Sequence, residues 1–345
     1  MATGAQVELT NDSDPVVDQQ DLAHSAGANG ATTVAGKYVG KEHKWARPPS
    51  SRWNHEHLYQ TLPIAGAIGL TWLFNTVYGP TFYPWLNAHY TPFEINCWWT
   101  LALTSGFYWA VGLVFMALDM VPFLHARVAQ YKLQPRKITW SEYAQVCGIV
   151  ARNQLCVNLP LTAASAYFMP RPTDLPLPGL GWTAVVYVVC LGFEEAGFYL
   201  VHRAVHSKRL YAKVHKMHHR FSAPVAFAST YCTVAEHLSS NLLPIVLGVG
   251  LINAHWSLTI MFFCSLELGT LATHSDYNIP GLSDALQHDW HHYSFTENFG
   301  PTGVIDEWLG TNSNYKVWLG ELQRRDKDTP GWYTRARMEL AQKTQ

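Results

Sequence analysis

Long apolar blocks alternate with shorter polar segments along the 345 residues of the chain. Residues 61–78, 98–124 and 182–201 are apolar over lengths that suffice for a helix to cross a bilayer. Residues 143–169 form a less uniform block, because four polar side chains between residues 152 and 158 interrupt it. The pattern therefore predicts helices that span a membrane.

The block at 143–169 is compatible with a complete span, with a kink at Pro160 or with an interfacial helix. Four prolines in residues 170–180 end any helix there. Residues 238–252 and 256–273 are two further apolar segments joined by only three residues, which predicts a tight helical hairpin that enters the bilayer and returns. The predicted fold is all-α, an integral membrane helical bundle of about four spans plus this hairpin.

Composition divides the chain into four regions. Residues 1–50 are rich in small and polar residues, have no aromatic residue before Tyr38, and predict a disordered cytosolic tail. Residues 51–130 predict an N-terminal transmembrane hairpin, residues 131–312 a histidine-rich domain, and residues 313–345 a polar C-terminal cytosolic tail. The first residues lack the basic start and apolar core of a cleavable signal peptide, so internal spans are expected to target the chain.

The distribution of Lys and Arg predicts the orientation of the spans. Basic residues gather up to Arg52 and return at Arg127, with none in the 74 residues between. Residues 78–96, which are aromatic and carry Glu94 as their only charge, are expected to form an interfacial loop on the translocated side. By the positive-inside rule, the N-terminus and the basic segment 202–220 face the cytosol.

The overall composition separates the chain from ordinary soluble proteins. Charged residues make up 14% and aromatic residues 13% of the chain, whereas about a quarter of a typical globular chain is charged. The formal net charge of -1 argues against a nucleic-acid-binding protein. The six cysteines show no CxxC pair, so neither a disulfide framework nor a zinc-finger pattern is indicated.

Histidines are concentrated in two motifs that follow apolar blocks. Residues 202–219 read HRAVHSKRLYAKVHKMHH and residues 288–292 read HDWHH. Imidazoles three or four residues apart share one helix face, which suits a metal site. A hairpin at 238–273 would return the chain so that both motifs lie on one side of the membrane. The candidate ligands are His202, His206, His215, His218, His219, His274, His288, His291 and His292, with His237 as a possible tenth.

This number of imidazoles exceeds the three or four ligands that a single zinc ion needs, and it suits two metal ions. Imidazole donors alone leave Zn, Cu, Fe and Ni open. A site at the cytosolic mouth of a hydrophobic bundle is placed to act on a lipid chain or fused-ring substrate. Iron is favoured there because an unactivated C–H bond needs an oxidant generated from oxygen.

Three carboxyl groups are candidates for orienting these imidazoles. Glu195 lies in an apolar span, where a carboxylate needs a functional or paired role, and it is seven residues before His202 on nearly the same helix face. Glu236 would either cap the start of the hairpin or reach the metals. Asp289 would either be a helix N-cap or support its neighbouring imidazoles.

The chain resembles one family in its histidine motifs HxxxH, HxxHH and HxxHH. It resembles that family also in the phrases FEEAGFYLVHRAVH, YAKVHKMHHRFSAP, THSDYNIP, HDWHHYSFTENFG and GVIDEWLGT. Over about residues 132–311 the chain is similar to the fatty acid hydroxylase and sterol desaturase superfamily of membrane di-iron enzymes. The nearest branch is that of the 4-methyl sterol oxidases and fatty-acid-hydroxylase-domain proteins. The family's three histidine boxes fall on His202 and His206, on His215, His218 and His219, and on His288, His291 and His292, and its isolated histidine falls on His274.

The resemblance implies a multi-pass enzyme of the endoplasmic reticulum membrane whose active site faces the cytosol. It implies two iron ions, O2, and electrons from NAD(P)H through cytochrome b5 and its reductase. The implied reaction is hydroxylation, in some relatives repeated oxidation, of an unactivated C–H bond of a lipid, sterol or terpenoid-like substrate.

Desaturation and the removal of an aldehyde carbon are alternatives with the same metal site. A catalytically inactive membrane scaffold that regulates lipid synthesis is the alternative from another class, which the intact histidine boxes disfavour. Thr233, Val234 and Asp276 depart from the pattern of close relatives near the expected pocket, which favours a specialised substrate.

Overall fold

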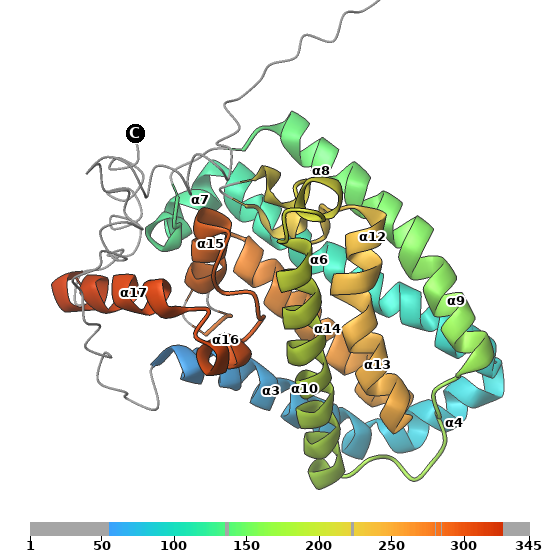
Figure 1. Ribbon diagram of the computed structural model, residues 1–345. Coiled ribbons are helices and arrows are strands. Elements are labelled where there is room, and N and C mark those ends of the chain that lie inside the picture. Colours follow the sequence, from blue (N-terminus) through green and yellow to red (C-terminus); the bar gives the residue numbers. More distant parts are fainter. Residues whose placement is uncertain (1–54, 135–137, 222–223, 280, 284, 327–345) are drawn as a thin grey trace, which may run out of the picture.

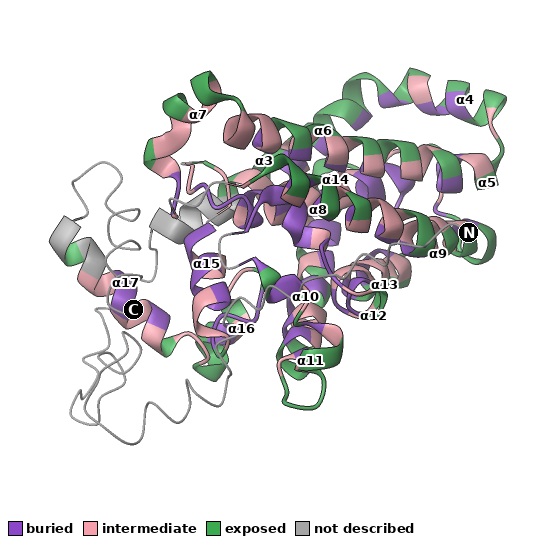
Figure 2. Cartoon of the chain, turned by 90° about the horizontal axis from the view of Figure 1, so that it is seen from above, coloured by how far each residue is buried: buried purple, intermediate pink, exposed green. Residues whose placement is uncertain are grey.

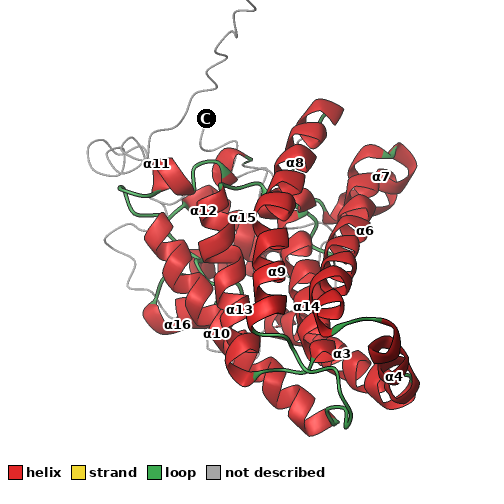
Figure 3. Cartoon of the chain, turned by 90° about the vertical axis from the view of Figure 1, so that its right-hand side faces the viewer, coloured by secondary structure: helices red, strands yellow, loops and turns green. Residues whose placement is uncertain are grey.

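The computed structural model describes residues 55–326 apart from 135–137, 222–223, 280 and 284. This part of the chain is helical and contains no strand, only an isolated antiparallel bridge between Lys132 and Tyr277 (Figure 3). The predicted all-α fold is confirmed. The predicted tail at 1–50 lies outside the described residues, and the division of the chain into four regions stays a prediction.

The helices and helical turns run in the order α3 (His55–Val77), α4 (Gly79–His89), α5 (Pro92–Glu94), η1 (Ile95–Trp99), α6 (Thr100–Met120), α7 (Pro122–Val128), η2 (Ala129–Tyr131), α8 (Trp140–Asn153), η3 (Gln154–Asn158), α9 (Leu159–Phe168), α10 (Leu180–Val205), α11 (Tyr211–Val214), η4 (His218–Arg220), η5 (Ala226–Thr230), α12 (Val234–Glu236), η6 (His237–Leu242), α13 (Leu243–Ile252), α14 (Trp256–His274), α15 (Ala285–Ser294), α16 (Val304–Leu309) and α17 (Ser313–Asp326).

Among the described residues, four helical stretches are long and apolar enough to cross a membrane, namely Pro92–Met120, Leu180–Val205, Val234–Ile252 and Trp256–His274. Leu62–Val77 is a shorter apolar helix. Large apolar side chains such as Leu251 and Phe168 are exposed on the outer faces, as lipid contact requires. Figure 2 shows buried residues gathered between the helices and exposed residues on the outer sides of α4, α7 and α11. The chain is therefore a multi-pass membrane protein.

One region differs from the expectation, and a second had been expected in one of three forms. Residues 78–96, expected as an interfacial loop, contain helix α4. Pro80 lies in the first turn of this helix, where its missing N–H removes no hydrogen bond within the helix. The block at 143–169 is a continuous helical path through α8, η3 and α9, and it is not among the four candidate spans. Pro160 stands in the first turn of α9, directly after the π-helical turn η3, which accommodates its missing hydrogen bond.

The predicted hairpin is confirmed. α13 ends at Asn253, whose left-handed φ of 51° reverses the chain so that α14 begins at Trp256. α13 packs closely along α10 (Figure 1). A Cβ added to Gly248 would stand 3.1 Å from Cys190 Cα, so small residues let these helices approach.

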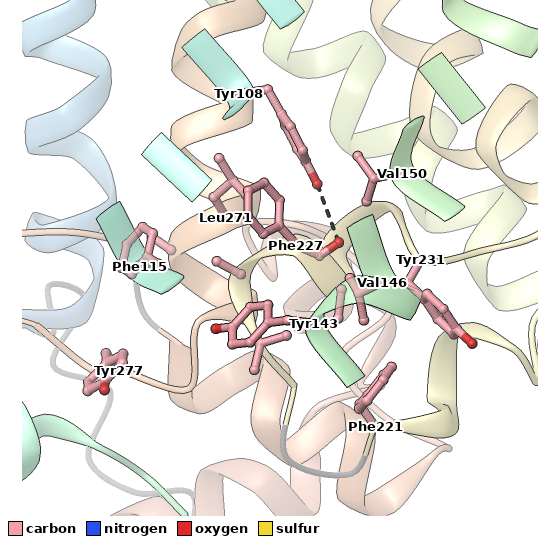
Figure 4. Packing of buried hydrophobic residues seen from close by; sticks show 14 residues of the cluster. Tyr108, Phe115, Tyr143, Val146, Val150, Phe221, Phe227, Tyr231, Leu271 and Tyr277 are labelled. Carbon is pink, nitrogen blue, oxygen red and sulfur yellow. Dashed lines mark hydrogen bonds between the residues drawn. The ribbon is translucent and has the colours of Figure 1, made fainter. Parts of the chain in front are cut away.

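A second packing centre joins α6, α8, η5 and α14 (Figure 4). Phe227 of η5 lies directly against Gly112 of α6, where any Cβ would overlap its ring. The segment from residue 313, expected as a tail, begins with α17, whose Trp318 packs on Trp290 of α15 with ring centroids 4.9 Å apart. These contacts fix α14 and α15, which carry histidines.

Candidate metal centre

Helix ends and short turns bring the predicted ligands to one end of the bundle. α10 continues past the predicted end of its span, so His202 lies in its last turn and His206 caps it. His218 and His219 lie in the 3-10 turn η4, and His274 is the last residue of α14. The third motif lies on α15. Because α13 and α14 form a hairpin, α15 returns to the end of α10.

Nine of the ten predicted histidines fall into two groups. The first group contains His202, His206, His215, His219 and His291, and the second contains His218, His274, His288 and His292; within each group the ligand atoms lie within 4.8 Å of one another. The groups adjoin, since the rings of His215 and His218 stack with centroids 5.2 Å apart. All nine rings except those of His206 and His288 belong to buried residues.

The Nε2 atoms point inward in both groups. In the first group, His219 Nε2 lies 3.0 Å from His215 Nε2 and 3.2 Å from His291 Nε2. In the second, His288 Nε2 lies 2.8 Å from His274 Nε2 and 2.9 Å from His292 Nε2. Two imidazole nitrogens bound at right angles at about 2.1 Å from one ion would be about 3.0 Å apart. Each group therefore fits the coordination of one transition-metal ion.

Acceptors behind the rings set the tautomer that a ligand needs. The Nδ1 atoms of His202, His291 and His274 lie 2.7, 2.8 and 2.8 Å from the backbone carbonyls of Phe299, Glu297 and Thr270. A carbonyl can only accept, so each Nδ1 carries the proton and each Nε2 presents its lone pair to the group.

The histidines outside the spans are held neutral. Burial lowers the pKa of His218, His219 and His292 well below its ordinary value, and the charge that neighbouring imidazoles would carry lowers it further. Neutral imidazole is the form that binds a metal ion.

Glu236 is a direct partner of the first group. Its Oε1 lies 2.8 Å from His215 Nδ1 and 4.0 Å from His218 Nδ1, so the carboxylate stands behind one member of each group. Its Oε2 is buried without a hydrogen-bond partner among the described residues. An ionised carboxylate at this place would compensate part of the charge of metal ions held by the neutral imidazoles.

Glu195 has a different role from the one predicted. It does not contact His202; its carboxylate accepts from Thr302 N at 3.0 Å, Thr302 Oγ1 at 2.8 Å and Ile305 N at 3.1 Å. The helix-face argument failed because the Nδ1 of His202 is already bonded to Phe299 O. Glu195 instead anchors the loop that supplies that carbonyl.

Asp289 is not an N-cap, because it lies inside α15. It is buried and hydrogen-bonded to the amide of Gln134. His237 lies outside both groups, with Nε2 2.8 Å from Asn158 Oδ1 on the π-helical turn η3. It therefore faces the bundle, not the candidate metals.

The loop after α15 is the part that the motifs did not reveal. Asp306, fully buried, accepts from Phe299 N at 2.9 Å and Gly300 N at 2.6 Å. The side chain of Glu297 accepts from Trp290 Nε1 at 3.0 Å. Both acids lie in the phrases TENFG and GVIDEWLGT, but the orienting atoms are backbone carbonyls, which leave no residue signature.

A cavity of about 230 Å³ opens beside both groups. His202 and His215 of the first group and His218, His274 and His288 of the second line it. Part of the cavity wall is apolar and comes from the membrane helices α10 and α14, through Leu191, Phe198, Phe263 and Leu266. The cavity thus joins an apolar wall from two membrane helices to both candidate metal sites.

Comparison with known proteins places the chain in a family. A family model described as fatty acid hydroxylase matches residues 187–311. The chain is 37% identical to the fatty acid hydroxylase ahd1 of Mycosarcoma maydis over 76% of this chain and 68% of that protein. It is 30% identical to a very-long-chain aldehyde decarbonylase of Oryza sativa over 67% of this chain and 90% of that one. It is 28% identical to methylsterol monooxygenase 1 of Danio rerio over 66% and 82%. No solved structure matches the chain. The chain thus belongs to the fatty acid hydroxylase family and is an oxidoreductase.

Proposed function

We propose that the protein is a membrane di-iron oxygenase that hydroxylates an unactivated C–H bond of a lipid, sterol or terpenoid-like substrate. The observation that carries the proposal is the pair of imidazole groups that open onto one cavity between membrane helices. The relatives named as a fatty acid hydroxylase and a methylsterol monooxygenase support oxidation of a lipid.

When bound, two iron ions would supply the oxidising chemistry with O2. The overall reaction inserts one oxygen atom of O2 into a C–H bond and reduces the other to water, with two protons and two electrons from NAD(P)H. The protein's own residues hold the site: the nine imidazoles would bind the ions, and carbonyls such as Phe299 O hold the Nδ1 protons. Phe198 and Leu266 exclude water from the substrate side.

Cytochrome b5 and its reductase are the proposed electron donors, and the endoplasmic reticulum membrane is the proposed location, with the site facing the cytosol. A basic surface supports both proposals. Six exposed cations lie on the segment that carries the first two histidine motifs: Arg203, Lys208, Arg209, Lys213, Lys216 and Arg220. They are suited to an acidic partner protein, and they satisfy the positive-inside rule.

A desaturase or an aldehyde-decarbonylating enzyme is the second candidate, which the aldehyde decarbonylase relative favours. Both reactions would use the same histidines. Mass spectrometry of the product separates the three reactions, because hydroxylation adds an oxygen atom, desaturation removes two hydrogens and decarbonylation removes a carbon.

The test is expression with iron in a membrane host, followed by lipid profiling and metal analysis of the purified protein. We expect two iron ions per chain and an O2-dependent product, with both reduced in His218→Ala. His89→Ala, at an exposed helix end remote from the groups, is the matched control and should keep its iron. Tightly held zinc after iron-replete expression, with no O2-dependent product, would refute the proposal.

A further inference from the structure

Glu267 is an acidic side chain of the cavity with an unpaired oxygen atom among the described residues. Glu267 lies in the middle of the membrane helix α14 and lines the cavity, and its Oε2 is shielded from solvent with no hydrogen-bond partner among the described residues. The residues that line the cavity include no Lys or Arg. A carboxyl group placed in a spanning helix without a partner is unfavourable unless something binds it.

Polar groups that line the same cavity from neighbouring elements are already paired. The Tyr108 hydroxyl lies 3.0 Å from Ser229 Oγ and 2.7 Å from Thr230 Oγ1, and Figure 4 shows it reaching the backbone of Phe227 as well. These residues come from α6 and η5, which both pack against α14. Tyr108, Ser229, Thr230 and Glu267 all line the cavity. These four residues make a polar subsite between the membrane helices. Within this subsite, only the carboxyl group of Glu267 has an oxygen atom without a partner among the described residues.

The subsite is remote from the metal end of the cavity. Glu267 and His274 are seven residues, or about two turns, apart on one face of α14, which corresponds to roughly 10 Å along the helix axis. The face between them, with Thr270 and Thr273, also lines the cavity. A substrate that fills this length would hold one group at Glu267 while another part reaches the imidazoles.

A hydroxyl group is the partner that fits. An ionised carboxylate only accepts hydrogen bonds, whereas a protonated one also donates. A hydroxyl both donates and accepts, so it pairs with either form, whereas a ketone oxygen pairs only with the protonated form. We propose that Glu267 binds a hydroxyl group of the lipid substrate and places the oxidised carbon several bonds away. This inference rests on the proposed function, since it specifies the substrate class of the same cavity.

Binding of defined probes tests the subsite without turnover. Full-length protein in nanodiscs would be titrated with tritiated hexadecan-1-ol and with heptadecane, with empty nanodiscs as the background. The alkane keeps the chain length but can neither donate nor accept a hydrogen bond. We expect the alcohol to bind about tenfold or more tightly than the alkane, as pairing of a buried and otherwise unsatisfied carboxyl group implies. Glu267→Leu should bring the ratio close to one, and Glu267→Gln should keep part of it.

Several outcomes would overturn the inference. Equal affinities for alcohol and alkane in the unmodified protein would do so, even if Glu267→Leu fails to fold. A larger loss of preference in Glu194→Gln than in Glu267→Gln would assign the hydroxyl to a different carboxyl group of the cavity lining. In the active enzyme, oxidation of hexadecan-1-ol next to its hydroxyl carbon would contradict the separation of about two helical turns.

The test is independent of the metal chemistry. The alcohol preference should persist in His218→Ala, which is expected to lose turnover. A protein that prefers the alcohol but makes no O2-dependent product would refute the proposed function and leave the subsite standing. An active oxygenase without the preference would refute the subsite alone.

Discussion

Removing the carboxylate of Glu236 should weaken metal binding by a calculable amount. The residue provides one charge-assisted hydrogen bond, from His215 Nδ1 to Oε1 at 2.8 Å, and its second contact with an imidazole nitrogen is 4.0 Å long. A hydrogen bond to a charged group contributes about 1.5–3 kcal/mol, and about 1.4 kcal/mol corresponds to a tenfold change in affinity. We therefore expect Glu236→Ala to lower iron affinity by roughly 10- to 100-fold, the usual range for loss of such a partner.

The amide variant should have a smaller effect. Glu236→Gln keeps an acceptor for His215 but loses the charge, which contributes about half of the bond strength, so we expect roughly a tenfold loss. The assay is competition with a chelator of known affinity, read as iron retained per chain. Glu142→Gln, a carboxylate in the exposed capping box of α8, is the matched control and should bind iron as the unmodified protein does. Unchanged iron affinity in a folded Glu236→Ala protein would refute the assignment of Glu236 to the metal centre.

Four further changes test other parts of the structure. Glu195→Ala leaves three donors of residues 302–305 without their acceptor. Thermal unfolding in detergent should show a free energy of unfolding lower by roughly 2–4 kcal/mol, together with lower iron content. Unaltered stability would contradict the anchoring role. Gly112→Ala should lower the free energy of unfolding by roughly 1–3 kcal/mol through overlap with Phe227, read as a lower unfolding temperature. Gly106→Ala on the same helix meets no atom within 4 Å and should not lower it. Lys213→Glu combined with Lys216→Glu should slow reduction of the protein by an acidic donor protein and weaken the salt dependence of that rate. Arg324→Glu on α17 is the control and should change neither. Equal stopped-flow rates at low salt would exclude this surface as the docking site. His237→Ala should retain its iron and His215→Ala should lose it, and loss of metal from both would place His237 among the ligands.

The sequence predicted the all-α fold because it depends on strong, local signals. Apolar blocks identify spans through length and composition, and the three-residue link at 253–255 leaves the chain little choice except to reverse. The number and spacing of the histidines predicted one common pool of candidate ligands. Their assignment to two groups was not predictable, since His218 and His219 are adjacent in sequence but belong to different groups. His218 and His219 lie in a 3-10 turn, where adjacent side chains point about 120° apart, and their spacing in sequence does not show which group each ring joins.

The carboxyl groups show the limit of arguments from spacing. Glu195 and His202 do lie near one face of α10, yet the imidazole is turned toward the chain segment after α15 and not along its own helix. The sequence interval between His202 and Phe299 is 97 residues, so only the tertiary fold decides that this carbonyl is the acceptor. Glu195 and Asp306 then act on the centre indirectly, by holding the backbone of residues 299–305 in place. Because a carbonyl is present in every residue, its role depends on the packing of the loop. The sequence specifies that role indirectly, through side chains such as Glu195 and Asp306 that fix the loop.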